Sequence, residues 1–235
     1  RALTASGGPA VSLPAARSAH YPARRAARGA VLRIARKGAG MEPTVAPRDR
    51  LTLEEARRRA EQVSQVAYVI DLDLQAGSKV FHGDVSITFD HAGGDTFLEW
   101  VGGRLDRFVV NGVEAEPVWD GARLTLPGSL LAPHNEIHLA YERAYDHTGE
   151  GFHQFIDPED GREYLYTQFE PYSAHRLFPC FDQPDLKATY RVSVSAPADW
   201  AVVSAGAELD RQALPDGRTR RLFAETVRFS TYLMS

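Results

Sequence analysis

Apolar and polar side chains alternate along much of the chain after residue 68. From Tyr68 to Leu74 apolar residues occupy every second position around Asp71 and Asp73, and the same period of two returns between Asp84 and Phe89. Successive side chains of a strand point to opposite faces, so this pattern predicts strands with one buried face and one wet face.

Further short segments are rich in β-branched, aromatic or alternating residues and are predicted to be strands: Thr96–Trp100, Arg107–Val110, Arg123–Leu126, Glu136–Tyr141, Glu163–Phe169, Thr189–Ser195, Ala201–Ser204 and Arg221–Thr226. Gly, Pro, Asn and Asp separate them at close spacing, and Asn111-Gly112 is typical of a tight hairpin turn. The prediction is an all-β fold, an antiparallel β-sandwich or a curled, saddle-like sheet.

One short helix is predicted near residues 53–63. Thr52 and Glu55 have the spacing of a capping box, and Glu54 and Glu55 suit the positive end of the helix dipole.

Residues 1–40 differ in composition from the rest of the chain. They are rich in Ala, Arg, Gly and Pro, and their apolar residues are too scattered to form a core. We expect a disordered segment here, or upstream sequence placed before a true start at Met41, and treat 41–235 as the folded domain. A transit peptide or a twin-arginine signal at Arg24-Arg25 is an alternative, although Arg33 interrupts the apolar run that should follow.

The charge of the chain is unevenly distributed. Residues 1–40 contain eight Lys or Arg and no Asp or Glu, so the remainder carries 19 basic against 31 acidic side chains. This acidic domain argues against a nucleic-acid partner. No run of 18 apolar residues occurs, so no membrane span is expected. A single cysteine excludes an internal disulfide and favours a cytoplasmic location.

The stretch from Tyr164 to Tyr190 concentrates the candidate chemistry. It begins as a strand and breaks at Glu170-Pro171, where proline favours an extended preceding residue. Gln168 and Glu170 should therefore lie on one face at a strand end. Arg176 and Asp182 follow among apolar rings, which predicts a buried polar turn.

Two other constellations are interpreted as structural. His134 and His138 have the spacing of a zinc-binding helix, but the residues around them alternate like a strand, on which the two histidines would be ~13 Å apart. Cys180, with His175 and Asp182 nearby, suggests a thiol nucleophile, but a lone cysteine between Pro179 and Phe181 is more often a small buried hydrophobe.

At Thr167-Gln-Phe-Glu170, Arg176 and Pro179-Cys-Phe-Asp-Gln-Pro184 the sequence resembles the N-terminal β domain of the gluzincin aminopeptidases of the aminopeptidase N family. The similarity extends from about Leu51 to Ser235 and includes Phe81-His-Gly83 and Asn111-Gly112. Gln183 departs from the family, which often has glutamate there. The zinc motif His-Glu-x-x-His and the exopeptidase motif Gly-x-Met-Glu-Asn are absent, so the chain resembles a fragment that ends before them.

The resemblance implies roles for four residues. Glu170 would accept the protonated α-amine of a peptide N-terminus, Gln168 would line the pocket for the first side chain, and Arg176 and Asp182 would brace the loop. The residues alone leave another role open, in which Glu170 is an exposed charge or the partner of Arg176.

The resemblance also implies a zinc-dependent aminopeptidase whose downstream catalytic domain holds the metal. The fragment itself is then expected to bind no zinc and to be inactive. Its aromatic face of Tyr166, Phe169 and Tyr172 would pack on that domain. The alternative is a non-catalytic, stand-alone β-sandwich binding or scaffolding module.

Overall fold

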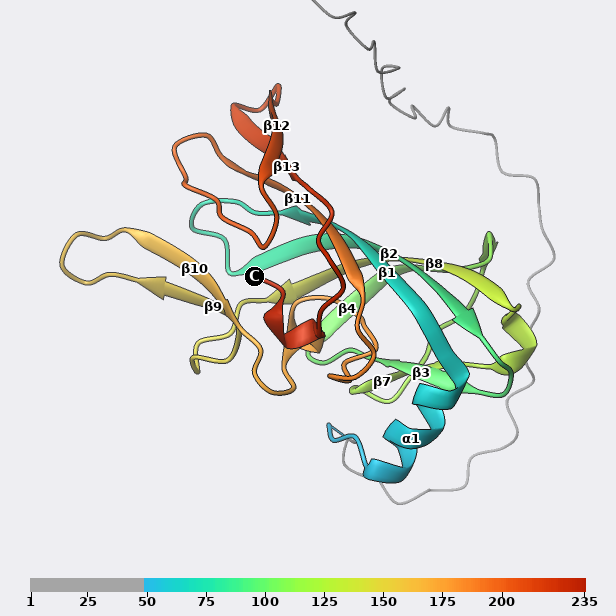
Figure 1. Ribbon diagram of the computed structural model, residues 1–235. Coiled ribbons are helices and arrows are strands. Elements are labelled where there is room, and N and C mark those ends of the chain that lie inside the picture. The colour runs from blue at the N-terminus through green and yellow to red at the C-terminus, as the bar shows by residue number, and fades with distance from the viewer. Residues whose placement is uncertain (1–48) are drawn as a thin grey trace, which may run out of the picture. The chain divides into compact units, whose positions relative to one another are not determined.

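The computed structural model describes residues 49–235, and the prediction made for residues 1–40 lies outside this range. The described chain is built from one helix, short 3-10 turns and thirteen strands, so the all-β prediction is confirmed (Figure 1). The strands are β1 Val63–Asp73, β2 Val80–His91, β3 Thr96–Glu99, β4 Gly103–Val110, β5 Val113–Glu114, β6 Val118–Trp119, β7 Arg123–Leu126, β8 His134–Ala144, β9 Gly151–Ile156, β10 Glu163–Gln168, β11 Thr189–Pro197, β12 Glu208–Ala213 and β13 Arg218–Phe223.

Eight strands form one sheet in the order β12-β13-β11-β1-β2-β8-β4-β5, and β3, β7 and β6 form a second sheet. The alternation around β2 has the predicted effect, because Val85, Ile87 and Phe89 are buried between more exposed neighbours. The pairing of β1 with β11 is parallel, whereas the other pairs are antiparallel. The chain reaches β11, the parallel partner of β1, only after it has built the second sheet and the β9–β10 hairpin.

The core lies on the inner face of the large sheet and is rich in aromatic rings. Tyr68 stacks on Tyr190 at 5.3 Å between ring centroids, and Tyr190 stacks on Phe229 at 4.7 Å. Trp100 is completely buried and meets Tyr141 edge-on. Such rings bury large apolar areas, and this core fixes the strands that support the site.

Helix α1, Leu53–Gln62, begins at the predicted capping box. Thr52 Oγ1 accepts a hydrogen bond from the Glu55 N–H, and the Glu55 carboxylate accepts one from the Thr52 N–H. Glu55 also forms an ion pair of 2.6 Å with Arg123 of β7, and this pairing lowers the pKa of Glu55 to about 2. The helix is thereby attached to the second sheet.

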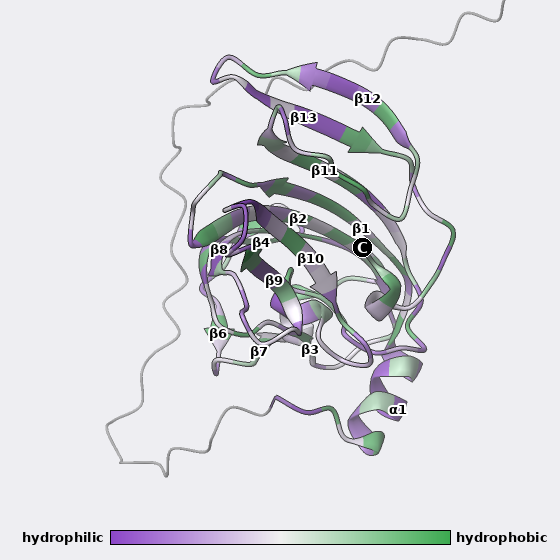
Figure 2. Ribbon diagram, turned by 90° about the vertical axis from the view of Figure 1, so that its left-hand side faces the viewer, coloured by the Kyte–Doolittle hydropathy of each residue, from purple (hydrophilic) through white to green (hydrophobic). Residues whose placement is uncertain are grey.

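Asn111 and Gly112 form the predicted hairpin turn between β4 and β5, with φ of 50° and 79°. The strand predicted at Ala201–Ser204 is wrong. The side chains of that segment alternate in exposure, but its backbone pairs with no neighbouring strand. Next to it, the Ala205 N–H donates to the Ser235 carbonyl. The prediction also missed β5, β6, β9 and β12. All residues of β12 are exposed, and hydrophilic colour dominates this strand in Figure 2.

The β9–β10 hairpin is a two-stranded sheet of its own that projects from the rest of the described chain (Figure 1). Its second strand, β10, is the beginning of the stretch from Tyr164 to Tyr190 that the sequence singles out. No helix within 49–235 has the length and apolar composition needed to cross a bilayer.

Candidate functional site

Two polar side chains are exposed where β10 ends. Gln168 is its last residue, opposite Gly151 of β9. Gln168 and Glu170 are exposed, while Phe169 between them is 1 % exposed and belongs to the core. Gln168 and Glu170 are thus exposed on either side of a buried anchor.

The chain then closes into a tight turn that leads to the 3-10 turn η2, Ala174–Arg176. The Ser173 N–H donates to the Phe169 carbonyl at 2.9 Å, and the Arg176 N–H donates to the Ser173 carbonyl at 3.1 Å. The Glu170-Pro171 peptide bond is cis. These bonds connect Glu170 to the polar turn behind it.

Asp182 is completely buried and holds that turn together. Its carboxylate accepts hydrogen bonds from the His175 N–H at 3.2 Å and from the Thr231 hydroxyl at 2.6 Å, and Oδ2 lies 2.7 Å from His175 Nδ1. The Asp182 N–H donates to Glu99 Oε2 at 2.9 Å. The prediction of a buried polar turn is confirmed, and Asp182 lies at its centre.

His175 carries a positive charge inside this turn. Its Nε2 lies 3.1 Å from Asp49 Oδ1, although the two groups are not aligned for a hydrogen bond. Burial favours the neutral imidazole, but the carboxylates of Asp182 and Asp49 outweigh it and raise the pKa of His175 to about 9. The ring is thus an imidazolium between two carboxylates near neutral pH.

Arg176 forms its ion pair with Asp146, a carboxylate that the sequence did not suggest as its partner. Its Nη1 lies 3.5 Å from Asp146 Oδ1, in the connection between β8 and β9. Arg143 binds the same carboxylate through two hydrogen bonds of 2.7 and 2.8 Å. Arg176 thus connects the turn to the base of the β9–β10 hairpin, and it forms no ion pair with Glu170 or Asp182.

Gly151 makes this connection possible. A Cβ at this position would lie 2.2 Å from Asp146 Oδ2 and 2.9 Å from Arg176 Cδ, and its φ is +78°. Only glycine combines that backbone conformation with so close an approach.

A buried ion pair supports the turn from beneath. Arg59 of α1 lies 2.8 Å from Glu99 of β3, and its Nε donates to Gln183 Oε1 at 2.9 Å. The Gln183 amide donates in turn to the Ala56 carbonyl. Burial raises the pKa of the Glu99 carboxyl, although Arg59 opposes the shift. The Tyr172 hydroxyl also donates to Glu99.

Sequence reasoning missed Arg59 and Glu99. Arg57, Arg58 and Arg59 are consecutive, and nothing in the sequence distinguishes the one that is buried. Gln183, noted as a departure from the family, is explained by its contacts, because a glutamate could not donate to the Ala56 carbonyl.

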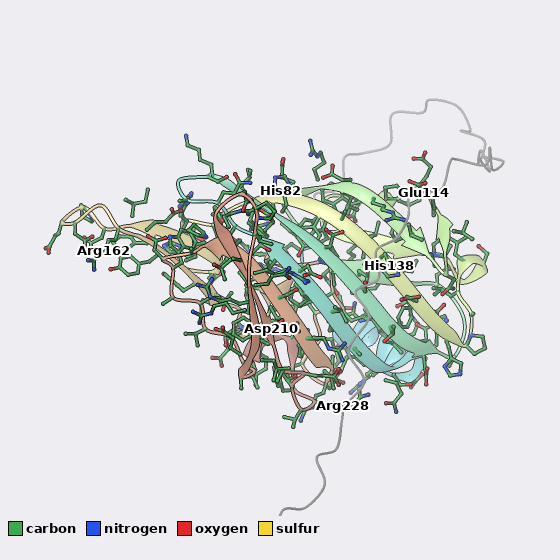
Figure 3. The ribbon with its side chains drawn as sticks, turned by 90° about the horizontal axis from the view of Figure 1, so that it is seen from above. His82, Glu114, His138, Arg162, Asp210 and Arg228 are labelled. Atoms are coloured by element: carbon green, nitrogen blue, oxygen red, sulfur yellow. The ribbon has the colours of Figure 1, made fainter. Side chains whose placement is uncertain are left out.

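The sequence analysis interprets two groups as structural, the pair His134 and His138 and the single Cys180, and their surroundings agree with that interpretation. His134 and His138 lie on β8, and Figure 3 labels His138 there. Each histidine pairs with its own carboxylate, His134 with Asp90 and His138 with Glu136. Cys180 is buried, and burial raises the pKa of its thiol well above the usual range, so it is not a thiolate.

Two of the aromatic residues predicted to share an exposed face do not lie on it. Phe169 is in the core, and the half-buried Tyr172 packs against the His175 ring at 4.8 Å between centroids. Of the three, only Tyr166 is exposed. It lies two positions before Gln168 in β10, at one of the alternate positions whose side chains are exposed.

The family model of the peptidase M1 N-terminal domain matches residues 106–233, so the chain belongs to the M1 peptidase family.

Known proteins with similar sequences carry the names of aminopeptidases. The chain is 41 % identical over 164 residues to aminopeptidase N of Streptomyces lividans, an alignment that covers 67 % of this chain and 19 % of the relative. It is 34 % identical over 140 residues to a probable M1 family aminopeptidase of Encephalitozoon cuniculi, covering 57 % of this chain and 15 % of that protein. The chain thus spans about a fifth or less of these relatives.

A solved structure shares the fold. The M1 zinc metallopeptidase of Deinococcus radiodurans superposes with a TM-score of 0.60 at 21 % identity, and the match covers 74 % of this chain and 41 % of that one.

Proposed function

We propose that this chain is the substrate-recognition domain of a zinc-dependent aminopeptidase that removes residues from peptide N-termini. The observation that supports the proposal is the exposure of Gln168, at the end of β10, and of Glu170, two residues later, on either side of the buried Phe169. The family assignment and the names of the relatives support it.

Glu170 has the chemistry needed to bind a terminal ammonium. Its carboxylate is exposed and forms no ion pair with any residue in the range 49–235, so it is available to a ligand. A carboxylate holds an ammonium by a charge-assisted hydrogen bond, which strengthens when a second domain excludes water. The Gln168 amide beside it lines the space for the first side chain. Arg176 and Asp182 keep both residues in place through the contacts described above.

Zinc would be bound elsewhere in the longer enzyme. The described residues contain no group of three His, Cys, Asp or Glu side chains that could hold a metal ion, so they do not fit this cofactor. When bound in an aminopeptidase, zinc polarises the scissile carbonyl and activates water. The part assigned to this chain is binding and orientation of the substrate, and the chain alone is then inactive.

A cytoplasmic location is part of the same proposal. Cys180 is the single cysteine of the chain, and it is buried and unpaired, as expected of a protein that does not rely on disulfides.

The test is made on the full-length enzyme. Glu170→Gln removes the charge and keeps one acceptor, whereas Glu170→Ala removes both. The alanine variant should lose roughly 30-fold or more in kcat/KM on free-amine peptides, because losing one partner of a desolvated charge pair costs ~2–5 kcal/mol. The glutamine variant should lose less.

Two controls separate recognition from structure. N-acetylated peptides, which offer no ammonium, should be hydrolysed no worse by the variants than by the parent. Glu159→Ala, at an exposed carboxylate in the β9–β10 loop, should leave kinetics unchanged. Normal kcat/KM of Glu170→Ala on free-amine peptides would refute the role of Glu170, whereas a full-length protein without peptidase activity would favour a non-catalytic binding or scaffolding module.

A further inference from the structure

A serine, a histidine and a glutamate lie in contact on the face of the large sheet that points away from the core. Ser86 of β2 is directly opposite His138 of β8, and its Oγ lies 2.7 Å from Nδ1 of the imidazole. Glu136 Oε1 lies 3.2 Å from Nε2, the other nitrogen of the same ring. These three residues are called the Ser86 cluster below, and Figure 3 labels its histidine.

The glutamate determines which ring nitrogen can take up a proton. An ionised carboxylate only accepts hydrogen bonds, so Glu136 favours the neutral imidazole that carries its hydrogen on Nε2. Nδ1 is then free of hydrogen and accepts a hydrogen bond from the Ser86 hydroxyl. A hydroxyl, a base and a carboxylate that orients the base are the parts of an activated serine nucleophile.

A second histidine on the same strands has a carboxylate partner without the hydroxyl. His82 Nε2 lies 3.6 Å from Glu142 Oε2, and the His82 side chain is 48 % exposed. Within residues 49–235, the hydroxyl of Ser86 is the one that is hydrogen-bonded to a histidine ring. His82, also labelled in Figure 3, is therefore a natural comparison for His138.

The Ser86 cluster is rigidly supported and open to solvent. Strands β2 and β8 are neighbours inside the large sheet, with β1 on one side and β4 on the other. Side chains on such strands are held more precisely than side chains on loops. Ser86 is half-buried and the His138 side chain is 42 % exposed, so a small molecule can reach the oxygen.

Two neighbouring side chains suit the binding of an ester. Val69 of β1 lies opposite Ser86 and is 40 % exposed, which offers an apolar contact to a small acyl group. Arg107 of β4 lies opposite Ala140, two positions after His138, and forms no ion pair within the described residues. Its guanidinium is thus available to stabilise the negative oxygen that forms when a hydroxyl attacks a carbonyl.

An open hollow of about 600 Å³ adjoins the Ser86 cluster. Thr88 and Glu136 line it, and each lies two positions along its strand from Ser86 or His138, on the same face. Gln65 adds an amide to the lining. The hollow therefore offers polar partners to the leaving alcohol of an ester whose carbonyl lies at Ser86.

We propose that the Ser86 cluster is an acyl-transfer site, which takes small acyl groups from activated carboxylic esters. Ser86 Oγ attacks the carbonyl carbon, and its proton passes to His138 Nδ1. The bond to the leaving oxygen then breaks, and the leaving alcohol takes that proton. Water attacks the acyl-serine by the same route, which releases the carboxylic acid and restores the hydroxyl. This activity is independent of the proposed peptidase function, because it uses neither Glu170 nor zinc.

Reaction of the purified chain with p-nitrophenyl acetate tests the proposal. Peptide mass spectrometry locates the acetyl group, and nitrophenolate release measures turnover. Ser86 should be acetylated about 100-fold faster than Ser129, which is exposed and has no hydrogen bond to a histidine within the described chain, because a positioned base accelerates such steps by ~10²–10⁴.

Variants on the same face separate the roles of the side chains. His138→Gln should slow acetylation of Ser86 about 100-fold, and Glu136→Gln should slow it less. Arg107→Gln should slow it about tenfold, because a guanidinium in contact with water stabilises an oxyanion less than a buried donor does. His82→Gln is the matched control and should leave it unchanged. All four side chains are exposed, so each variant should keep the Tm of the parent.

Three outcomes would overturn the proposal. The first is acetylation of Ser86 no faster than that of Ser129. The second is an equal effect of His138→Gln and His82→Gln, which would show that exposed imidazoles react with the ester by themselves. The third is nitrophenolate release without any acetyl group on Ser86. In each case the contact of Ser86 with His138 would only stabilise the pairing of β2 with β8.

Discussion

The carboxylate of Asp182 lies 2.7 Å from Nδ1 of His175, and neither side chain is accessible to water. This pair joins the two ends of the turn behind Glu170. The loop that presents the proposed binding carboxylate therefore depends on an ionisable group that is charged at neutral pH.

The first prediction is that this domain loses stability between about pH 6.5 and 9. The pKa of His175 is raised to about 9 from 6.5, so the folded state binds the proton more tightly than the unfolded state. The stabilisation is complete below pH 6.5 and is lost as the pH rises through 9. It amounts to about 3 kcal/mol.

Urea unfolding at a series of pH values measures this dependence. His175→Gln should be less stable at pH 6 and should remove most of the slope. His82→Gln, at a side chain that is 48 % exposed, should keep the slope of the parent. A parent stability that is flat between pH 6.5 and 9 would contradict the charged state of His175.

The second prediction is that Gln183→Glu destabilises the domain. The substitution removes the donor to the Ala56 carbonyl and adds a buried charge beside Glu99. A loss of about 2–4 kcal/mol is expected at pH 8 and a smaller one at about pH 5, where the new carboxyl is protonated more readily. Gln212→Glu on the exposed strand β12 is the control, and an equal effect at both positions would argue against the buried contacts.

The third prediction is that the purified chain binds no stoichiometric zinc and hydrolyses no aminoacyl anilide. His134 and His138 are held apart on a strand by separate carboxylates, and a catalytic site needs three protein ligands with an open position. Metal analysis after dialysis, together with a chromogenic assay, measures both properties. One equivalent of zinc with turnover, both lost in His138→Ala, would show that the assignment of the metal to another domain is wrong.

The sequence predicts the local features of this fold well, because they depend on neighbouring residues. The period of two in β2, the capping box at Thr52 and the turn at Asn111 are all confirmed.

Contacts between distant parts of the chain were not predictable in this way. Arg59 and Glu99 are 40 positions apart, and Arg176 finds Asp146 where the sequence suggested Glu170 or no partner. The exposed aromatic face was also misplaced, because Phe169 is buried. Another exposed ring of the hairpin, Phe155, belongs to β9, a strand that the sequence pattern did not predict.

The parallel pair of β1 and β11 has a consequence for how the domain is made. Asp71 of β1 is 122 positions from Ser193 of β11, and β1 lies in the middle of the large sheet. At 5–20 residues per second, a ribosome needs roughly 6–25 s to synthesise the chain between them. During that time one edge of a central, apolar strand has no partner. Slower translation between β1 and β11 lengthens this interval, so we expect the yield of folded protein from a cell to fall when this part of the chain is translated more slowly.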